Sequence, residues 1–489
     1  MLQLLFLLGV MAIPFNGVKG VGALGELSHE LSVYPFMLAI AGVIAMKLVS
    51  AVAFETRGRT IGNGSPLPYI VAGIVLIIAL SVLLNVSSIA GSYFHERSGF
   101  AKFTNSMMVV FYGLGLSYAT YTLAPGRWQS LVILPIAVSV IFCLAYSAFE
   151  ILAQHGALSA VYAKMDSAVH SNNGDLVFKW NGKINLKVVS NWDQRIRSLC
   201  FEPPAFGNFA GFAWPWLVAG YMSNKGAMRT FYTTLLFLFT ALVIVSKART
   251  GWVMLSVDIL VLTALRFIYL VPVPGKFNRP LATGLIAAAA ASLVGGGIFY
   301  LADFHNIVLH VIGGTSVSNI SRLASQVSAM KIFEDHVLLG VGFGQYGFYV
   351  TQYMPNWGYL SYELRPWLIY PTAPWPSVYS LYARLACETG LVGLCAWIGL
   401  WLYLSYLVVT RSRRYLDQHG RLPTVAYALV MSFISVLVSS IATDTLRTPM
   451  IWISLGLGCA YLNSLALKGA VTKPAPRVVM PRLTTAHTD

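Results

Sequence analysis

Arginine is the residue type in this chain whose chemistry is easiest to read from its placement. Seven arginines lie in or beside the connections between long apolar stretches: Arg195, Arg197, Arg249, Arg322, Arg365, Arg384 and Arg447. A guanidinium group keeps its charge and binds phosphate oxygens bidentately. The pattern predicts a site for an anionic ligand such as a phosphate group.

Arg322 lies in the most distinctive of these connections, SRLASQVSAMKIFEDHVLLGVGFG, residues 321–344. Four apolar residues recur there at helical spacing: Ile320, Leu323, Val327 and Met330. This spacing predicts an amphipathic helix with those four residues on its apolar face. The glycines of GVGFG permit tight turns and close backbone approach. Because the run follows a helix rather than a strand, we expect a turn or packing role and not a nucleotide site.

Aromatic side chains are dense after this stretch, and twelve of them lie between residues 346 and 382: Tyr346, Phe348, Tyr349, Tyr353, Trp357, Tyr359, Tyr362, Trp367, Tyr370, Trp375, Tyr379 and Tyr382. A belt at the lipid headgroups explains such residues in a membrane protein. Stacking on the apolar faces of sugar rings is the alternative.

Other chemistry is sparse. Asp258 is the notable acidic residue inside an apolar stretch, where an ion pair with an arginine or a role in proton transfer would account for it. There is no GxxxxGK[ST], HExxH or DxD motif, and the five cysteines form no CxxC pair. We therefore expect no metal, no cofactor and no disulfide framework.

The elements that position these residues are membrane helices. The chain of 489 residues is 57% hydrophobic and 10% charged, with a mean hydropathy of +0.68, which excludes an ordinary soluble domain. About twelve apolar segments approach the 20 residues or so that cross a bilayer: 1–16, 33–53, 68–88, 105–123, 130–153, 205–222, 230–247, 251–269, 281–301, 385–409, 423–442 and 449–466. The expected fold is an all-α polytopic membrane protein, with 1–16 as a first helix rather than a cleaved signal.

Basic residues orient these spans. The connections of one side carry Arg57, Arg59, Arg127, Lys225, Arg229, Lys276, Arg279, Arg411, Arg413, Arg414 and Arg421, against Glu55 and Asp417. The positive-inside tendency places this side and both termini in the cytoplasm, and the seven arginines named first on the outer side. Topology thus explains the net charge of +15 without nucleic acid as a partner.

The predicted organisation follows from these spans. Transmembrane helices occupy 1–153, 205–301 and 385–466, and two outer connections occupy 154–204 and 302–384. Alternation around Asn181-Gly182 predicts a β-hairpin in the first connection. The second is expected to hold amphipathic helices, and the tail 467–489 is expected to be disordered.

Four segments of the chain resemble the bacterial O-antigen polymerase and O-antigen ligase superfamily. They are RIRSLCFEPPAFGNFAG, SKARTGWVML, SRLASQVSAMKIFEDHVLLGVGFG and PSVYSLYARLACETGLVG. Ala248 stands where the family usually has serine, and Val337 where it usually has proline. The resemblance covers about residues 195–400.

The resemblance implies a GT-C-type glycosyltransferase bundle in the bacterial inner membrane, with its active site facing the periplasm. Its substrate would be a glycan on undecaprenyl diphosphate, used without nucleotide or metal. By position, Arg249 and Arg322 would be the catalytic residues that bind the lipid diphosphate. The residues expected to bind substrate are Arg195, Arg197, Arg384, Tyr379 and Glu388. Membrane lipid and a chain-length regulator protein are the further partners that the resemblance suggests.

One departure separates the two branches of this superfamily. Tyr379 stands where the ligase has a histidine, and a tyrosine is a poor base at neutral pH. This favours polymerisation of repeat units over ligation to lipid A-core, which remains the alternative. His305, His310 and His336 lie in the same connection and could replace that histidine, although His336 fits a structural role better. A flippase is a third alternative, but transporters place charge near the midplane and show internal repeats.

Overall fold

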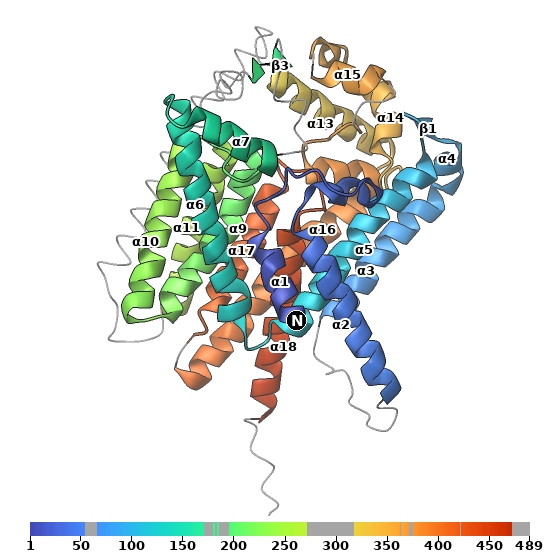
Figure 1. The fold of residues 1–489 in the computed structure, drawn as a ribbon. Helices are drawn as coiled ribbons and strands as arrows, with labels where there is room; N and C mark the ends of the chain where they lie inside the picture. Colours follow the sequence, from blue (N-terminus) through green and yellow to red (C-terminus); the bar gives the residue numbers. More distant parts are fainter. Residues whose placement is uncertain are drawn as a thin grey trace, which may run out of the picture.

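The structure is a computed structural model that describes residues 1–53, 66–170, 179–180, 183–184, 195–270, 317–361, 363–370, 375–420 and 422–471. Most of these residues are helical (Figure 1). The α-helices are α1 (Leu2–Met11), α2 (Val33–Ala53), α3 (Leu67–Leu84), α4 (Val86–Gly91), α5 (Gly99–Leu123), α6 (Leu134–Gln154), α7 (Ser159–Val169), α9 (Pro203–Ser223), α10 (Gly226–Val245), α11 (Arg249–Leu270), α13 (Val317–Asp335), α14 (Tyr346–Tyr353), α15 (Leu364–Ile369), α16 (Leu381–His419), α17 (Val425–Ser439) and α18 (Pro449–Val471). Shorter elements are the helical turns η1 (Gly22–His29), η2 (Gln129–Ile133) and η4 (Asn356–Leu360), and the strands β1 (Tyr93–Phe94), β2 (Arg97–Ser98), β3 (Lys179–Trp180) and β4 (Lys183–Ile184).

Seven helices of the described ranges are long and apolar enough to cross a membrane, which confirms the all-α polytopic class. A helix lies at eleven of the twelve predicted spans, and the span 281–301 falls outside the described residues. The predicted span 1–16 is only the 10-residue α1, which rises about 15 Å and covers half of a hydrocarbon core. The number of twelve spans and the GT-C-type architecture remain predictions.

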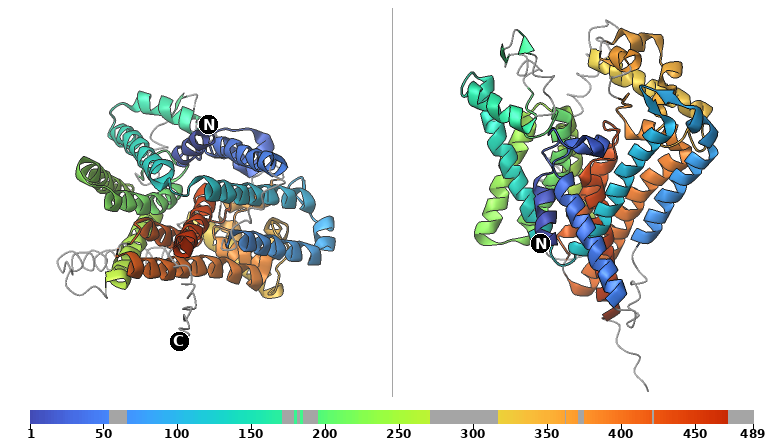
Figure 2. Two further views of the ribbon diagram at one scale, coloured as in Figure 1. Left: turned by 90° about the horizontal axis from the view of Figure 1, so that it is seen from below. Right: turned by 45° about the vertical axis from the view of Figure 1, so that its right-hand side comes forward.

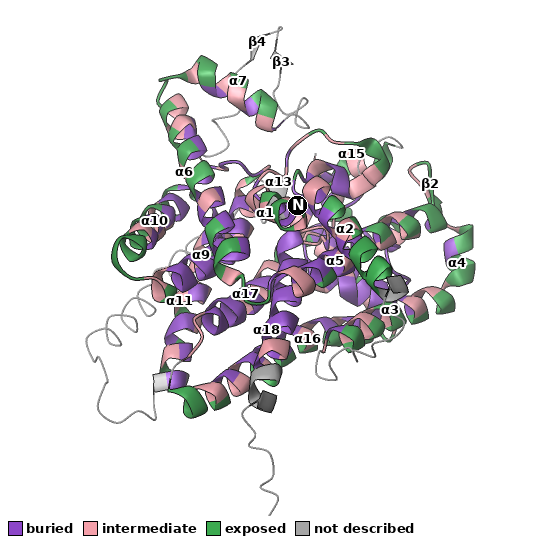
Figure 3. Ribbon diagram, turned by 60° about the horizontal axis from the view of Figure 1, so that its bottom comes forward, coloured by how far each residue is buried: buried purple, intermediate pink, exposed green. Residues whose placement is uncertain are grey.

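The long helices run side by side, and α7, α13, α14 and α15 cover one end of the bundle (Figures 1 and 2). This end is called the outer end below. The N-terminus and the end of α18 lie toward the opposite end (Figure 1), as expected for two termini on one side. Helix α18 packs on α5, and α9 packs on α10, α11 and α17. The inner helices α9, α17 and α18 are largely buried, while α3 and α10 expose apolar faces (Figure 3).

A small unit with its own hydrophobic core covers the outer end. Its core includes Ala324, Ile332, Val341, Tyr346 and Val350. Tyr349, Tyr353, Tyr359 and Trp367 pack against this core. Part of the aromatic density after residue 346 therefore holds α13 to α14, η4 and α15, an explanation that neither a headgroup belt nor sugar stacking had covered.

The buried face of α13 differs from the predicted one. The helix is present, but Leu323 is 43% exposed and Met330 42% exposed. Of the predicted residues, Ile320 is buried, and the rest of the buried side is formed by Ser321, Ala324, Ser325, Ser328, Ala329 and Ile332. Small side chains let α13 approach α16 and α14 closely, and Ser328 Oγ donates to the carbonyl oxygen of Val350 at 3.4 Å. Periodicity of large apolar residues was therefore the wrong guide to this face.

The GVGFG run has the turn and packing role that was predicted. Gly340, Gly342 and Gly344 have φ values of 66°, 107° and 82°, a region that residues with a Cβ rarely adopt. A Cβ on Gly340 would also collide with the backbone of Cys387 and Glu388 in α16. This loop and α16 can approach so closely only because position 340 carries no side chain.

The loop also repairs a break in α16. Helical dihedral angles fail at Gly390, with φ 68° and ψ −166°, which leaves backbone groups without helical partners. The amide of Val341 donates to the carbonyl oxygen of Cys387 at 2.9 Å, and the amide of Leu391 donates to the carbonyl oxygen of Val337 at 2.7 Å. The broken helix is thereby fixed in position below the outer unit.

Two further predictions concern the connections. Strands β3 and β4 pair antiparallel, with Lys179 opposite Ile184 and Trp180 opposite Lys183. This is the register expected for a hairpin around Asn181-Gly182. At the C-terminus, α18 continues to Val471, so the start of the predicted disordered tail 467–489 is helical, and the rest lies outside the described residues.

Candidate functional site

Charged side chains from five segments gather at the outer end. Glu202 precedes α9, Arg322 lies on α13, Glu363 precedes α15, Tyr379 precedes α16, and Asp444 and Arg447 lie between α17 and α18. The pKa of Glu202 responds to Arg322, Arg447, Glu363 and Asp444, and that of Tyr379 responds to Arg322 and Glu363. These six residues are called the outer cluster. They are far apart in the sequence, and the packing of the outer unit on the bundle brings them together.

Arg322 differs from Arg447, the other cation of the outer cluster, in having no ion pair within the described residues, whereas Arg447 pairs with Glu30. Its guanidinium carbon lies 5.5 Å from the centroid of the Tyr379 ring, a cation–π contact. Its Nε is buried without a hydrogen-bond partner, and within the described residues its side chain makes no ion pair. Since buried N–H groups almost always find a partner, this arginine is suited to an anionic ligand.

Tyr379 is held in an unusual conformation beside Arg322. Its φ of 59° is left-handed, a strained state for a residue with a side chain, and such states are frequent at functional sites. The Asp444 carboxylate holds the segment by accepting from the amides of Val378 at 2.7 Å and Tyr379 at 3.3 Å. Trp367 stacks on the Tyr379 ring, with 6.1 Å between centroids. Tyr379 is therefore fixed on three sides and presents its ring to Arg322.

The Tyr379 hydroxyl donates to Glu363 Oε1 at 3.1 Å. Burial raises the pKa of this hydroxyl, and the neighbouring Glu363 carboxylate raises it further. The group therefore keeps its proton at neutral pH, in agreement with the inference that Tyr379 cannot replace a histidine base.

Arg384 and Glu388 lie close to the outer cluster but bind each other. Arg384 Nε is 3.2 Å from Glu388 Oε2, and Arg384 Nη1 donates to the backbone oxygen of Asp444 at 2.8 Å. Glu388 is 1% exposed. This pair anchors the first turns of α16 to the turn that carries Asp444, and the predicted contact of either residue with substrate stays a prediction.

Arg197 is engaged even more completely. Its Nη2 lies 2.7 Å from both carboxylate oxygens of Asp166 in α7. Burial would raise the pKa of Asp166, but the hydrogen bond from His170 and the charge of Arg197 outweigh burial and hold that pKa well below its usual range. The pair ties α7 to the segment before α9, so the contacts of Arg197 are those of a structural residue.

Arg195 precedes α9 in the chain, and Arg249 is the first residue of α11, whose first turn packs against the first turns of α9. The amide of Ile196 donates to the backbone oxygen of Ser246 at 3.1 Å, which joins the Arg195 segment to the turn before α11. Arg249 begins α11 and is exposed. The glycines Gly207 and Gly251 let the first turns of α9 and α11 touch. Arg249 thus lies near the start of α9, at the outer end that also carries α13 with Arg322.

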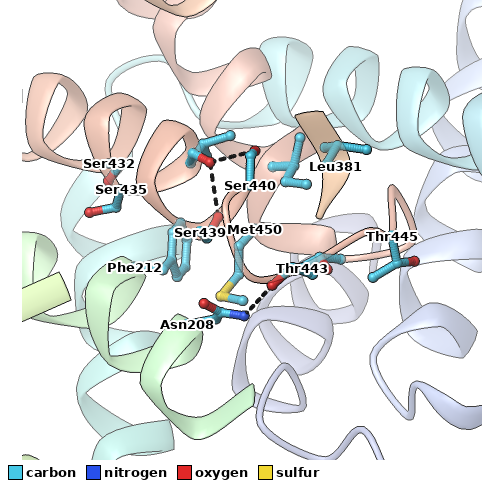
Figure 4. A pocket seen from close by; sticks show the side chains of 13 residues that line it. Asn208, Phe212, Leu381, Ser432, Ser435, Ser439, Ser440, Thr443, Thr445 and Met450 are labelled. Carbon is cyan, nitrogen blue, oxygen red and sulfur yellow. Dashed lines mark hydrogen bonds between the residues drawn. The ribbon is translucent and has the colours of Figure 1, made fainter. Parts of the chain in front are cut away.

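A small pocket lined by both polar and apolar residues lies beside the Asp444 turn (Figure 4). Its polar lining comes from α9, α17 and the turn before α18: Asn208, Ser432, Ser435, Ser439, Ser440, Thr443, Thr445 and Thr448. Asn208 Nδ2 donates to Thr443 Oγ1 at 2.8 Å (Figure 4). Asp258, buried beside this pocket, accepts from Ser435 Oγ at 2.9 Å. The arginine partner that was one expectation for Asp258 is absent from the described part of the chain.

The histidines of the outer connection do not enter the outer cluster where they can be placed. His336 ends α13 and packs edge-on against Tyr349, with 6.1 Å between ring centroids, which fits its predicted structural role. His305 and His310 lie outside the described residues. In the same described ranges no group of three or more His, Cys, Asp or Glu side chains is placed to hold a metal ion.

Residues 234–398 match the family model described as O-antigen ligase. This match covers about a third of the chain and supports the resemblance to the O-antigen polymerase and ligase superfamily. No curated protein matches the chain. Members of the superfamily are glycosyltransferase-like enzymes that act on lipid-linked glycans. The matched range includes Arg249, Arg322 and Tyr379, whereas Glu202 and Asp444 lie outside it.

Three acidic residues of the outer cluster were missed as site residues: Glu202, Glu363 and Asp444. Glu202 and Asp444 lie within a few residues of predicted span ends on the outer side, and Glu363 lies in the predicted outer connection 302–384. These carboxylates were not chosen, because an anion site requires cations and the arginines were the cations in view. The signal that could have found them is a carboxylate in a connection on the same outer side as the arginines.

Proposed function

We propose that this chain is a polysaccharide polymerase of the bacterial inner membrane. It would transfer a glycan from undecaprenyl diphosphate to the non-reducing end of another lipid-linked repeat unit, at the periplasmic face. The observation that carries the proposal is Arg322, whose buried Nε lacks a partner beside Tyr379 at the outer end. A diphosphate is the anion that the superfamily match suggests for this donor set.

In this proposal Arg322 binds an oxygen of the diphosphate. Negative charge develops there as the bond between the sugar C1 and the diphosphate breaks, so a fixed guanidinium stabilises the transition state more than the ground state. Arg249 and Arg195, near the start of α9, would add positive charge along the lipid-linked donor. Tyr379 and Asp444 would keep the Arg322 site in shape.

Purified protein supplied only with undecaprenyl-diphosphate-linked repeat units tests the polymerase against its alternatives. A ladder of longer lipid-linked chains, without any lipid A-core present, is the expected result. Product that forms only when lipid A-core is added would overturn polymerisation in favour of ligation. Movement of intact repeat units across a vesicle membrane, with no chain growth, would instead identify a flippase.

A matched pair of variants connects that assay to the site. Arg322→Ala should abolish chain growth, while Arg365→Ala should not, because Arg365 is an exposed arginine of α15 outside the outer cluster. Equal activity of both variants would contradict the assignment of Arg322.

A further inference from the structure

Glu202 occupies the N-cap position of α9 without acting as a cap. An N-cap carboxylate usually accepts from the backbone amides of the first turn, but the next two residues are Pro203 and Pro204, which have no N–H. The side chain of Glu202 makes no capping hydrogen bond. The two prolines start the helix by themselves, so the carboxylate is free for another role.

Glu202 is accessible to solvent, but it is also surrounded by protein groups that change the pKa of its carboxyl. The residue is exposed to solvent, yet burial by the surrounding protein raises the pKa of its carboxyl, and the charges of Glu363 and Asp444 raise it too. Arg322 and Arg447 act in the opposite direction. Within the described residues, no hydrogen bond or ion pair closes on this carboxylate. Glu202 and Arg322 are therefore close enough to influence each other electrostatically, and no direct ion pair joins them within the described residues.

The other carboxylates near this site are already used. Glu363 accepts from the Tyr379 hydroxyl and from Ser321 Oγ. Asp444 Oδ2 accepts from Ser377 Oγ and from the amides of Val378 and Tyr379. Glu30 is paired with Arg447, 3.3 Å from its Nε. Glu202 is the carboxylate of this group with both oxygens still available.

We propose that Glu202 is the general base that accepts the proton of the acceptor sugar hydroxyl, in place of the histidine of the ligase branch. This inference rests on the proposed function. The acceptor oxygen forms a bond to C1 of the donor sugar while the bond from C1 to the diphosphate oxygen breaks. The electron pair of that bond leaves with the diphosphate, which Arg322 binds, and the hydroxyl proton moves to the Glu202 carboxylate. Solvent access then lets Glu202 release the proton.

The pH dependence follows from this assignment. Glu202 acts as a base only when ionised, so kcat/KM falls as the pH falls through its pKa. Because that pKa is raised by the local environment, the acidic limb lies above the pH of about 4.5 expected for an exposed glutamate. The charged or titratable groups that set its position are Arg322, Arg447, Glu363 and Asp444.

The test compares Glu202→Gln, Glu202→Ala and Glu202→Asp in the chain-growth assay across pH. We expect Glu202→Gln to lower kcat about 10²- to 10⁴-fold, the usual contribution of a general base, and to lose the acidic limb. Glu202→Asp keeps a limb at a shifted pH, and formate restores activity to Glu202→Ala. Glu334→Gln, an exposed charge loss on α13, serves as the control with wild-type activity.

The outcomes separate this inference from the proposed function. If Glu202→Gln keeps both wild-type kcat and the acidic limb while Arg322→Ala is inactive, the base assignment is wrong and the polymerase proposal stands. If chain growth is absent in the wild type as well, the proposed function itself fails. Should Glu202→Gln not fold, the profile of Glu202→Asp decides: a limb unmoved from that of the wild type overturns the assignment.

Discussion

In the sequence, Arg197 and Arg322 look equally suited to bind an anion, because both lie in connections on the outer side. Their environments in the structure are opposite. Arg197 closes on both oxygens of Asp166 at 2.7 Å. Arg322 faces Tyr379, and its buried Nε has no hydrogen-bond partner among the residues that the structure describes. The contrast teaches that an arginine on the outer side is not by itself a ligand site. What distinguishes a binding arginine is the absence of a carboxylate that satisfies it.

Other buried cations are also paired with a carboxylate, as Arg197 is, and these pairs join one element of the fold to another. Arg384 with Glu388 joins α16 to the Asp444 turn, and Lys102 with Glu26 joins α5 to η1. Such pairs contribute little net stability relative to apolar residues, but they are costly to break when one charge is left buried. We therefore expect closed pairs to control folding and the open Arg322 site to control activity.

Breaking the closed pair should have the largest effect. Asp166→Ala leaves the Arg197 guanidinium, which is only 15% exposed, without its carboxylate, and should cost about 3–5 kcal/mol of stability. Thermal and denaturant unfolding in detergent measure this loss. The double variant Asp166→Ala/Arg197→Met removes the stranded charge and should recover part of the stability. An Asp166→Ala variant as stable as the wild type would show that the pair does not hold α7.

Removing the Arg322 guanidinium should affect activity rather than stability. Arg322→Ala is expected to lower kcat about 10²- to 10³-fold, the usual loss for one transition-state donor, or about 2.7–4 kcal/mol. Its unfolding transition should stay within about 0.5 kcal/mol of the wild type. Arg322→Lys should recover only part of the rate, since lysine keeps the charge but not the bidentate geometry. A large loss of stability in Arg322→Ala would place Arg322 with the closed pairs.

The loop that supports α16 offers a smaller and purely conformational test. Gly340→Ala puts a Cβ on a residue with φ 66° and against the backbone of α16, so we expect a loss of at least about 1–2 kcal/mol. Gly73→Ala in α3 is the control, because a Cβ there meets open space. Unfolding curves of the two variants should differ by that amount. Equal stability would contradict the close packing of the GVGFG loop on α16.

The smallest expected effect concerns the pair of Glu26 and Lys102, and it is measured as the pH dependence of stability. Burial would raise the pKa of Glu26, but Lys102 and nearby arginines outweigh it and lower that pKa to about 2. A lowered pKa contributes stability above pH 4.5 that is lost as the pH falls toward 2. Glu26→Gln should lack this loss over the same window. The same acid sensitivity in Glu26→Gln and in the wild type would assign it to other carboxylates.

The fold class was predictable because apolar length is a strong signal. Helices lie near their predicted places at eleven spans, and the opposite ends of the bundle carry the expected segments. The shortness of α1 was missed, although Pro14 inside the predicted span 1–16 and Asn16-Gly17 at its end are residues that end helices. The buried face of α13 was missed because small residues, not large ones, make its contact with α16.

The candidate site was predictable only in part. Arg322 and Tyr379 could be chosen from the family motifs, since both lie within the matched residues 234–398. The state of Arg197 was not readable, because the carboxylate that pairs with it, Asp166, comes from α7, whose packing the sequence does not display. For the same reason the significance of Glu202 depends on the charges of Arg322, Arg447, Glu363 and Asp444 near it, which come from segments far apart in the sequence.

The central claim is that the open guanidinium of Arg322 binds the lipid diphosphate. Equilibrium binding of undecaprenyl diphosphate to the full chain in nanodiscs tests it directly, with Arg322→Ala and Arg365→Ala side by side. The account predicts at least a tenfold rise in Kd for Arg322→Ala, which corresponds to about 1.4 kcal/mol, and no change for Arg365→Ala. Wild-type affinity in a folded Arg322→Ala protein would contradict it.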